Sequence, residues 1–220
     1  VEEHINTIKK NIDGITGIAP SIEREGLISY KGKVEGILIK GFKNDYDITK
    51  IQDNVINGNF NFSSEKSNEI VVGKRLSEKM NLKLGDEIIL YAIKGKELQN
   101  FNMPEIDKFK IIGFYETGMA QYDDIYCFIP YQRTIDFFKM ESGTSTTIDI
   151  MLNDMDNSNN ITRQLNEFLT IPLFAYSVFD LHSPIFSWIE MQKAPIPLIL
   201  GLISIVAFSN IITILLITVV

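Results

Sequence analysis

Cysteine and histidine are scarce in this sequence, which has one cysteine, Cys127, and two histidines, His4 and His182, among 220 residues. A single thiol cannot close a disulfide within the chain, so cysteine usage leaves the redox compartment open. A zinc or acid–base site needs ligands that converge, and two distant histidines with one cysteine are poor material for it. We therefore expect neither a metal site nor a cofactor.

Motifs that bind nucleotides or build a hydrolase are also missing. There is no G-x-S-x-G elbow and no phosphate-binding Gly-Lys-Ser/Thr loop. DMDNSNN at 154–160 begins like a calcium-binding loop. However, Asn159 stands where such a loop needs glycine, and Leu165 stands where it needs a bidentate glutamate. The segment is better interpreted as a turn that caps the next helix, and we expect no enzymatic activity in this chain.

Basic residues are in deficit, with 21 Lys and Arg against 28 Asp and Glu, a net charge of −7. Nucleic-acid binding is disfavoured, because no basic stripe is present to displace counterions from phosphates. Cytoplasmic segments beside a membrane helix usually carry an excess of Lys and Arg. Here only Lys193 immediately precedes the apolar end of the chain. This places the first ~190 residues on the non-cytoplasmic side, and an earlier membrane helix is then expected before Val1.

What the sequence does contain is a long apolar run. From Ala194 to Val220 there are 27 residues without a charge, which as a helix would reach roughly 40 Å. A bilayer core of about 30 Å needs only ~20 residues, so we predict a transmembrane helix rather than a buried core helix, which would usually keep polar positions on one face. Pro195 and Pro197 are tolerated in a first turn. Trp188 lies slightly upstream, where an interfacial aromatic is expected.

The rest of the chain mixes strand and helix patterns without a regular βαβ repeat, which predicts an α+β fold. Helical patterns occur at 4–12, 74–80, 131–140 and 160–169, and a polar loop with a short helix is expected at 45–61. Strands are expected at 18–30, 34–42, 68–73, 86–93, 109–115, 125–130, 145–152 and 173–181.

A long exposed loop is predicted from Lys94 to Asp107. Its apolar residues are Leu98, Phe101, Met103, Pro104 and Ile106, more than a disordered linker should carry. Exposed methionine and aromatic side chains suit a protein-binding surface. The loop could equally fold back and bury these side chains itself, and the pattern alone leaves both interpretations open.

Three stretches together resemble one family: IVVGKRLSEKMNLKLGDEIIL (70–90), FKIIGFYETGMAQYDDIYCFIP (109–130) and VAFSNIITILLITVV (206–220). They are similar to the permease subunit of the lipoprotein-releasing (Lol) ABC transporter, within a wider group of macrolide-efflux and cell-division permeases. The resemblance implies a permease in the bacterial inner membrane. Residues 1–183 would be its two-lobed periplasmic domain, with a β-rich central lobe at about 60–130, and residues 184–220 would be a pre-membrane segment and most of the second transmembrane helix.

The resemblance also implies partners. These are a separate cytoplasmic ATPase subunit, a second permease subunit (the same or a sister chain), lipoprotein cargo and a periplasmic lipoprotein carrier. The carrier would be hooked by the loop, for which the implied contact residues are Lys94, Leu98, Phe101, Met103, Pro104, Ile106, Asp107 and Lys108. The family usually places a basic residue just past the loop, whereas this chain has Asp107 there, beside Lys108. Trp188, Phe208 and Asn210 would pack against other helices or line a cavity.

Three functions remain in competition. The first is lipoprotein extraction and transfer to a carrier. The second is mechanotransmission by a permease of the same build, which drives efflux or activates a cell-wall hydrolase. The third is an extracytoplasmic sensor that signals through the helix.

Overall fold

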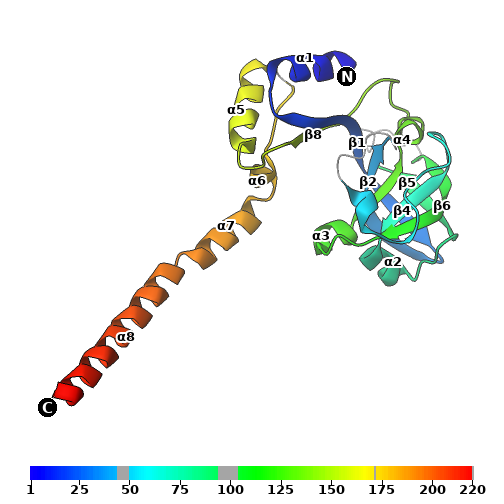
Figure 1. The fold of residues 1–220 in the computed structure, drawn as a ribbon. Helices are drawn as coiled ribbons and strands as arrows, with labels where there is room; N and C mark the ends of the chain where they lie inside the picture. Colours follow the sequence, from blue (N-terminus) through cyan, green and yellow to red (C-terminus); the bar gives the residue numbers. More distant parts are fainter. Residues whose placement is uncertain (44–49, 94–103, 171, 220) are drawn as a thin grey trace. The chain divides into compact units, whose positions relative to one another are not determined.

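The computed structural model describes residues 1–43, 50–93, 104–170 and 172–219 (Figure 1). The chain divides into two compact units, Val1–Asn153 and Asp154–Val220. Strands and helices are mixed within the chain as the sequence pattern indicates, so the α+β class is confirmed. The predicted division at residue 183 and the predicted central lobe at 60–130 stay predictions.

A closed β-barrel forms the centre of the first unit. Its strands are hydrogen-bonded in the order β1-β2-β7-β4-β6-β5, and β5 pairs again with β1. The pairings are mixed, since β2–β7 and β4–β6 are parallel and the others are antiparallel. The strands are β1 (Ile15–Tyr30), β2 (Lys33–Phe42), β4 (Glu69–Gly73), β5 (Glu87–Ala92), β6 (Ile106–Tyr115) and β7 (Tyr126–Pro130).

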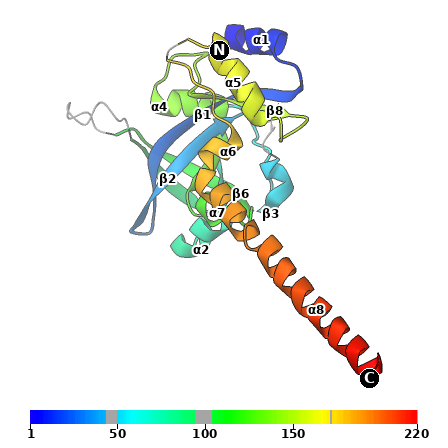
Figure 2. The same ribbon diagram turned by 90° about the vertical axis from the view of Figure 1, so that its left-hand side faces the viewer.

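The interior of the barrel is filled by apolar side chains at alternating positions of its strands. Along β1 and β2, Ile28 and Ile39 are fully buried, and Ile88 and Ile111 meet them from β5 and β6 in one core cluster. The β1–β2 hairpin (Figure 2) turns through two residues with positive φ, Lys31 at 46° and Gly32 at 81°. Two successive positive φ angles are what a tight two-residue hairpin requires, and this turn falls between the strands predicted at 18–30 and 34–42.

β1 is longer than the barrel. Its first half, Ile15–Ser21, leaves the barrel and pairs antiparallel with β8 (Thr147–Leu152). The Asp149 carboxylate of β8 accepts a hydrogen bond from the Ser21 hydroxyl at 2.9 Å and forms an ion pair with Lys40 of β2 at 2.8 Å. β1 is therefore shared by the barrel and a small two-stranded sheet, and polar contacts connect the two.

One strand lies where a loop was predicted. After a 3-10 helix, η2 (Ile51–Asn54), the short strand β3 (Val55–Gly58) pairs with the end of β6. The Asn/Gly-rich composition favoured a loop, but pairing with β6 provides hydrogen bonds that outweigh weak strand propensity. The predicted short helix is present as η2.

Within residues 1–43, 50–93 and 104–153 the first unit has four α-helices: α1 (Glu2–Asn11), α2 (Lys74–Met80), α3 (Ala120–Asp123) and α4 (Tyr131–Phe138). α2 and α4 each begin directly after a strand and end at a residue with left-handed backbone, Asn81 and Lys139. α4 buries Ile135, Phe137 and Phe138, so its apolar face closes part of the core.

The second unit consists of α5 (Ser158–Phe168), α6 (Val178–Leu181), α7 (Ser183–Lys193) and α8 (Ile196–Val219). The strand predicted at 173–181 is wrong. The side-chain amide of Asn166 instead bonds to the backbone N–H and C=O of Ala175, at 2.8 and 3.0 Å. Ser177 and Asp180 then form a reciprocal capping box that starts α6. Local hydrogen bonding overrides the alternating pattern here.

The C-terminal end of the second unit is apolar helix. α8 begins at Ile196, so Pro197 lies in its first turn, as predicted. Residues Ser183–Val219, 37 in all, are long and apolar enough to cross a membrane. The last 24 of these residues form α8, which lies within the uncharged run predicted to be a transmembrane helix.

Candidate functional site

The predicted partner-binding loop is the connection between β5 and β6. The two strands are antiparallel, with Tyr91 opposite Ile106 and Leu90 opposite Asp107. The backbone N–H of Ala92 also donates to the carbonyl of Glu105 at 2.9 Å. Ile106 and Asp107 are therefore strand residues and not loop residues, which corrects the predicted loop boundary and the predicted start of the strand at 109. Pairing with β5 makes β6 begin three residues before Phe109, its first buried apolar residue.

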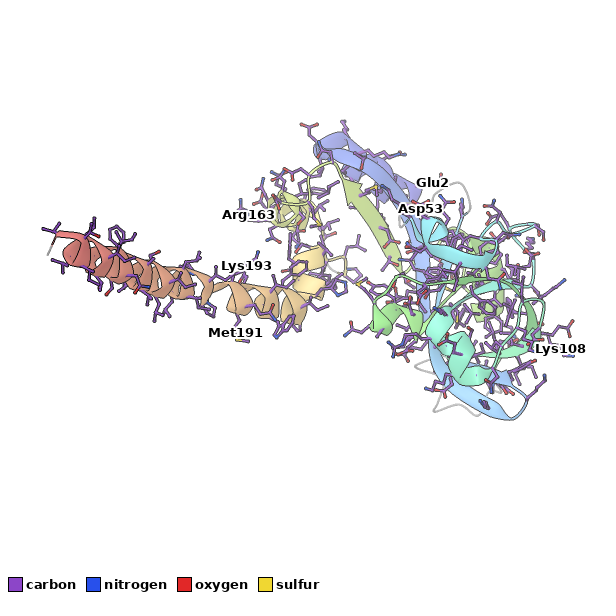
Figure 3. The ribbon with its side chains drawn as sticks, turned by 60° about the horizontal axis from the view of Figure 1, so that its bottom comes forward. Glu2, Asp53, Lys108, Arg163, Met191 and Lys193 are labelled. Carbon is purple, nitrogen blue, oxygen red and sulfur yellow. The ribbon has the colours of Figure 1, made fainter. Side chains whose placement is uncertain are left out.

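The implied contact residues divide between described and undescribed parts of the chain. Lys94, Leu98, Phe101 and Met103 lie outside the described residues. Pro104 and Lys108 are exposed, Ile106 is 55% exposed, and Figure 3 shows Lys108 pointing away from the barrel. The return strand of the loop thus presents one apolar and one basic side chain to solvent at its start.

Asp107 is held within the domain. Its carboxylate forms an ion pair with Arg133 of α4 and accepts the backbone N–H of Lys108 at 2.8 Å. Arg133 Nε also donates to Asn68 Oδ1 at 2.5 Å, and Asn68 Nδ2 donates to the carbonyl of Lys108 at 2.9 Å. The negative charge of Asp107 is therefore neutralised within the fold, by Arg133.

Arg133 fixes this arrangement from the core side. Its side chain is only 11% exposed, and its guanidinium lies 5.1 Å from the centre of the Phe109 ring and 5.6 Å from that of Phe137. A second ion pair joins Lys139, just past α4, to Glu105. We call the two pairs, Asp107–Arg133 and Glu105–Lys139, the loop clamp. Sequence reasoning missed Arg133, because no pattern within α4 tells which strand a helical arginine will meet.

We expect Arg133→Met to lower the free energy of unfolding by about 1–3 kcal/mol. Removing one partner of a buried ion pair is strongly destabilising, but the Asp107 side chain is 42% exposed, so water compensates part of the loss. Lys139→Met is the matched control. Its side chain is 61% exposed, so the change should stay within about 1 kcal/mol. Urea unfolding measures both, and equal effects would contradict a dominant role for Arg133.

Asp123 is the buried carboxylate that a search for catalysis would select, since only 1% of it is exposed. It accepts hydrogen bonds from the Thr117 N–H and hydroxyl at 2.9 and 2.8 Å, and from the Gly118 N–H at 3.1 Å. Its acceptor sites are used to order the turn before α3. Asp123 is therefore a structural residue.

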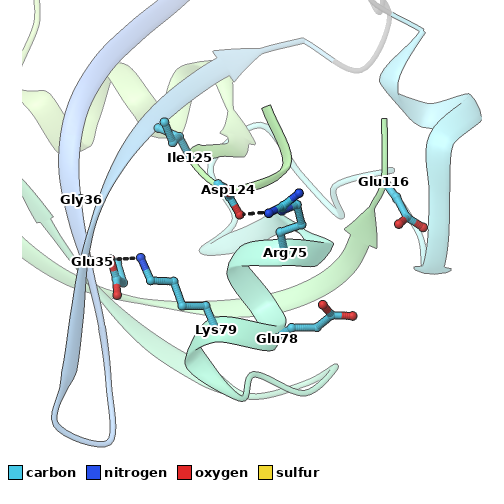
Figure 4. A pocket seen from close by; sticks show the side chains of 8 residues that line it. All are labelled: Glu35, Gly36, Arg75, Glu78, Lys79, Glu116, Asp124 and Ile125. Atoms are coloured by element: carbon cyan, nitrogen blue, oxygen red, sulfur yellow. Dashed lines mark hydrogen bonds and ion pairs between the residues drawn. The ribbon is translucent and has the colours of Figure 1, made fainter. Parts of the chain in front are cut away.

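One open pocket, of about 650 Å³, lies beside α2 and the β1–β2 hairpin (Figure 4). Two ion pairs occur in it, Arg75–Asp124 at 3.1 Å and Lys79–Glu35 at 2.7 Å. Within the described ranges no three His, Cys, Asp or Glu side chains gather as metal ligands would. Its full lining is Glu35, Gly36, Arg75, Glu78, Lys79, Glu116, Asp124 and Ile125.

The apolar helix contains polar residues of two kinds. The hydroxyls of Ser204, Thr213 and Thr218 donate to carbonyls four residues earlier, at 2.8, 2.9 and 2.8 Å. The carboxamide of Asn210 has no hydrogen bond among the described residues, and it is exposed, as are Phe208 at 69% and Trp188 at 57%. Asn210 is the side chain of this helix that most needs an external partner.

Residues 1–168 match a family model described as a MacB-like periplasmic core domain. Among solved structures, the extracellular domain of the noncanonic ABC-type transporter YknZ from Gram-positive bacteria is 19% identical, with a TM-score of 0.49 over 76% of this chain and 82% of that one. The periplasmic region of MacB from Actinobacillus actinomycetemcomitans is 14% identical, with a TM-score of 0.47 over 76% and 72%. A domain of a putative permease protein from Porphyromonas gingivalis is 12% identical, with a TM-score of 0.37 over 76% and 70%.

Proposed function

Because the chain belongs to the family of MacB-like periplasmic core domains, we propose that it is the extracytoplasmic part of an ABC transporter permease that releases lipoproteins from the membrane to a soluble carrier. The family is one of transporter permease domains, which are not themselves enzymes. The observation that carries the proposal is the order along the chain, in which the family domain is followed by the apolar helix Ser183–Val219. A domain tied to a membrane helix in this way is placed to act at the bilayer surface.

The free-energy cost of lipoprotein release requires an energy source such as ATP hydrolysis. Withdrawing acyl chains from a bilayer costs about 0.8 kcal/mol for each CH₂ group, so a lipoprotein with several chains cannot leave without one. We propose that the energy comes from a cytoplasmic ATPase subunit, acting through α8 and through a second permease subunit against which Asn210 would pack.

The β5–β6 connection is the part of the domain that we assign to carrier binding. The proposal is supported by the apolar residues of the loop and by the loop clamp, which fixes the strand that leaves it. Asp107 does not oppose a carrier with a free negative charge, since Arg133 is paired with it. Lys108 is then the exposed basic residue next to the loop.

Efflux or hydrolase activation by mechanotransmission is the second candidate. It requires the same family, the same helix and the same ATPase, but it does not require a carrier. The difference therefore rests on the loop alone. The sensor interpretation has lost its support, because the family is a transporter family.

The transfer reaction tests the proposal directly. The permease would be reconstituted with its ATPase subunit in proteoliposomes that contain a fluorescent triacylated lipoprotein. We expect ATP-dependent appearance of the lipoprotein in complex with a soluble carrier, and none with a non-hydrolysable ATP analogue. ATP hydrolysis without release would favour mechanotransmission.

Topology can be tested with a single introduced thiol. Cys127 is fully buried, and burial raises the pKa of its thiol, so the wild-type chain should react little with maleimides. Pro104→Cys places a thiol on an exposed residue. We expect a membrane-impermeant maleimide to label this variant in cells with a permeabilised outer envelope and an intact inner membrane. Labelling only after the inner membrane is broken would contradict an extracytoplasmic domain.

A further inference from the structure

The edge of β2 is only partly used within the barrel. β2 pairs with β1 from Lys33 to Gly41, but with β7 only from Leu38 to Phe42. The N–H of Leu38 donates to the carbonyl of Ile125 at 3.0 Å, at the point where the chain turns away toward α3. The first half of β2 therefore has no strand on its second side in the part of the chain that the structure describes.

Strand geometry identifies the residues that form this free edge. Backbone groups of successive residues point to opposite sides of a strand. Since Leu38 faces β7, Gly36 and Val34 face the same side, and each presents one N–H and one C=O. No hydrogen bond of these four groups is found among the described residues. The free edge thus offers two donors and two acceptors in the spacing of a β-ladder.

The pocket of Figure 4 lies along this edge. Gly36 is part of its lining, and a Cβ added there would meet no atom within 4 Å. α2 forms the facing wall with Arg75, Glu78 and Lys79. The space is therefore open to a backbone that approaches β2, with side chains of α2 beside it.

The charge and polarity of the pocket lining define which side chains of a bound segment would fit there. The lining holds four carboxylates against two cations, a formal charge of −2. Glu35, Asp124 and Glu116 are in ion pairs with Lys79, Arg75 and Lys74, whereas the carboxylate of Glu78 has no hydrogen bond or ion pair among the described residues. Beside the edge, Val34 and Ile125 expose 55% and 38% of their surfaces. A basic side chain flanked by apolar ones would match this pattern.

We propose that the free edge of β2 binds an extended segment of a partner protein, which adds to the barrel as a short strand. Its backbone would bond to Val34 and Gly36, a basic side chain would reach Glu78, and an apolar side chain would cover Val34 and Ile125. Strand addition of this kind takes its affinity from main-chain bonds and its selectivity from side chains at the edge. The inference does not depend on the lipoprotein-releasing function, because it uses none of the loop residues.

The test uses the full chain in lipid nanodiscs and a defined probe. The probe is a fluorescein-labelled hexapeptide of alternating valine and lysine, and binding is followed by fluorescence anisotropy. Two control peptides separate the contribution of charge to binding from the contribution of backbone hydrogen bonds. One carries glutamate in place of lysine, and the other keeps the lysines but has an N-methyl group on every backbone nitrogen, which removes the N–H donors of both strand edges and leaves the charge. We expect both controls to bind at least about tenfold more weakly than the probe.

Substitutions in the protein test the same contacts between the peptide and the free edge. Gly36→Pro removes the N–H of residue 36 and should weaken probe binding about tenfold, whereas Gly36→Ala keeps the N–H and should bind normally. Glu78→Gln should weaken the valine–lysine probe but not an alternating valine–threonine peptide. Hydrogen exchange adds a site-specific measurement. The amides of Val34 and Gly36 should be protected by the probe, and those of Glu35 and Ile37, which face β1, should not change.

The outcomes are distinct. Equal binding of the N-methylated peptide would show attraction by charge alone and would overturn the proposal. Absence of probe binding would also overturn it, and would mean that the Lys79–Glu35 and Arg75–Asp124 pairs shield the edge, as charged residues often do. If Gly36→Pro fails to fold, the N-methylated peptide and the exchange measurement still decide the question on the unaltered chain.

Discussion

Phe101→Ala combined with Met103→Ala is expected to lower the affinity for a lipoprotein carrier by about 30-fold or more, while the free energy of unfolding changes by no more than about 0.5 kcal/mol. Residues that anchor an interface lose roughly 2 kcal/mol or more of binding energy on truncation. Residues that contact only a partner contribute little to the domain's own stability. Carrier capture by the purified permease and urea unfolding measure the two effects separately.

Phe109→Ala is the matched control in the same hairpin. Phe109 is fully buried and packs against Phe137, with ring centres 5.5 Å apart. Truncating such a residue costs about 3–5 kcal/mol, so this variant should lose stability. If the loop variant is destabilised to a similar degree, the loop is packed and its apolar residues serve the fold. If the loop variant is stable and captures the carrier normally, the carrier-binding proposal fails and mechanotransmission becomes the better function.

Gly58→Ala is expected to lower the free energy of unfolding by about 3–5 kcal/mol, a large effect for the addition of one methyl group. Gly58 has φ +78°, and a Cβ there would lie 2.1 Å from the carbonyl oxygen of Ile112. That carbonyl cannot withdraw easily, because it accepts the N–H of Asn59 at 3.0 Å. The methyl group would therefore have to push β3 away from β6.

Gly118→Ala separates the two causes of this loss. Gly118 has the same φ, +78°, but a Cβ there would have nothing within 4 Å. Only the cost of a left-handed backbone applies, about 1–2 kcal/mol. Chemical unfolding of both variants gives the difference, which measures the close approach of β3 to β6. Equal losses would show that β3 is loosely held and that the strand contributes little.

Sequence reasoning succeeded where one local pattern decides the structure. The uncharged run from Ala194 to Val220 predicts the helix α8, and the adjacent strand patterns at 18–30 and 34–42 predict the β1–β2 hairpin. In both cases the chain within about twenty residues contains the whole physical reason. The α+β class followed in the same way, from counting such local patterns.

The errors have a common cause, which is hydrogen bonding between distant residues or with side chains. β3 forms because β6 is beside it, although Asn57 and Gly58 have low strand propensity. Residues 173–181 alternate as a strand does, but Asn166 and Asp180 use side-chain bonds to hold a different backbone. Closure of the barrel and the loop clamp are likewise set by pairing across the fold, which the order of residues alone does not specify.

The length of β1 has a consequence for how the domain folds. Its second half finds β2 immediately, as a local hairpin, and such contacts form within microseconds. Its first half waits for β8, since Ser21 and Thr147 are 126 residues apart in sequence. At synthesis rates of about 5–20 residues per second, the wait is roughly 6–25 s. For that interval Ile18 and Ala19, both buried in the finished protein, lie on an unpaired strand. Aggregation of the nascent domain is therefore expected to begin at Ile15–Ser21, and to be suppressed once Leu152 has been made.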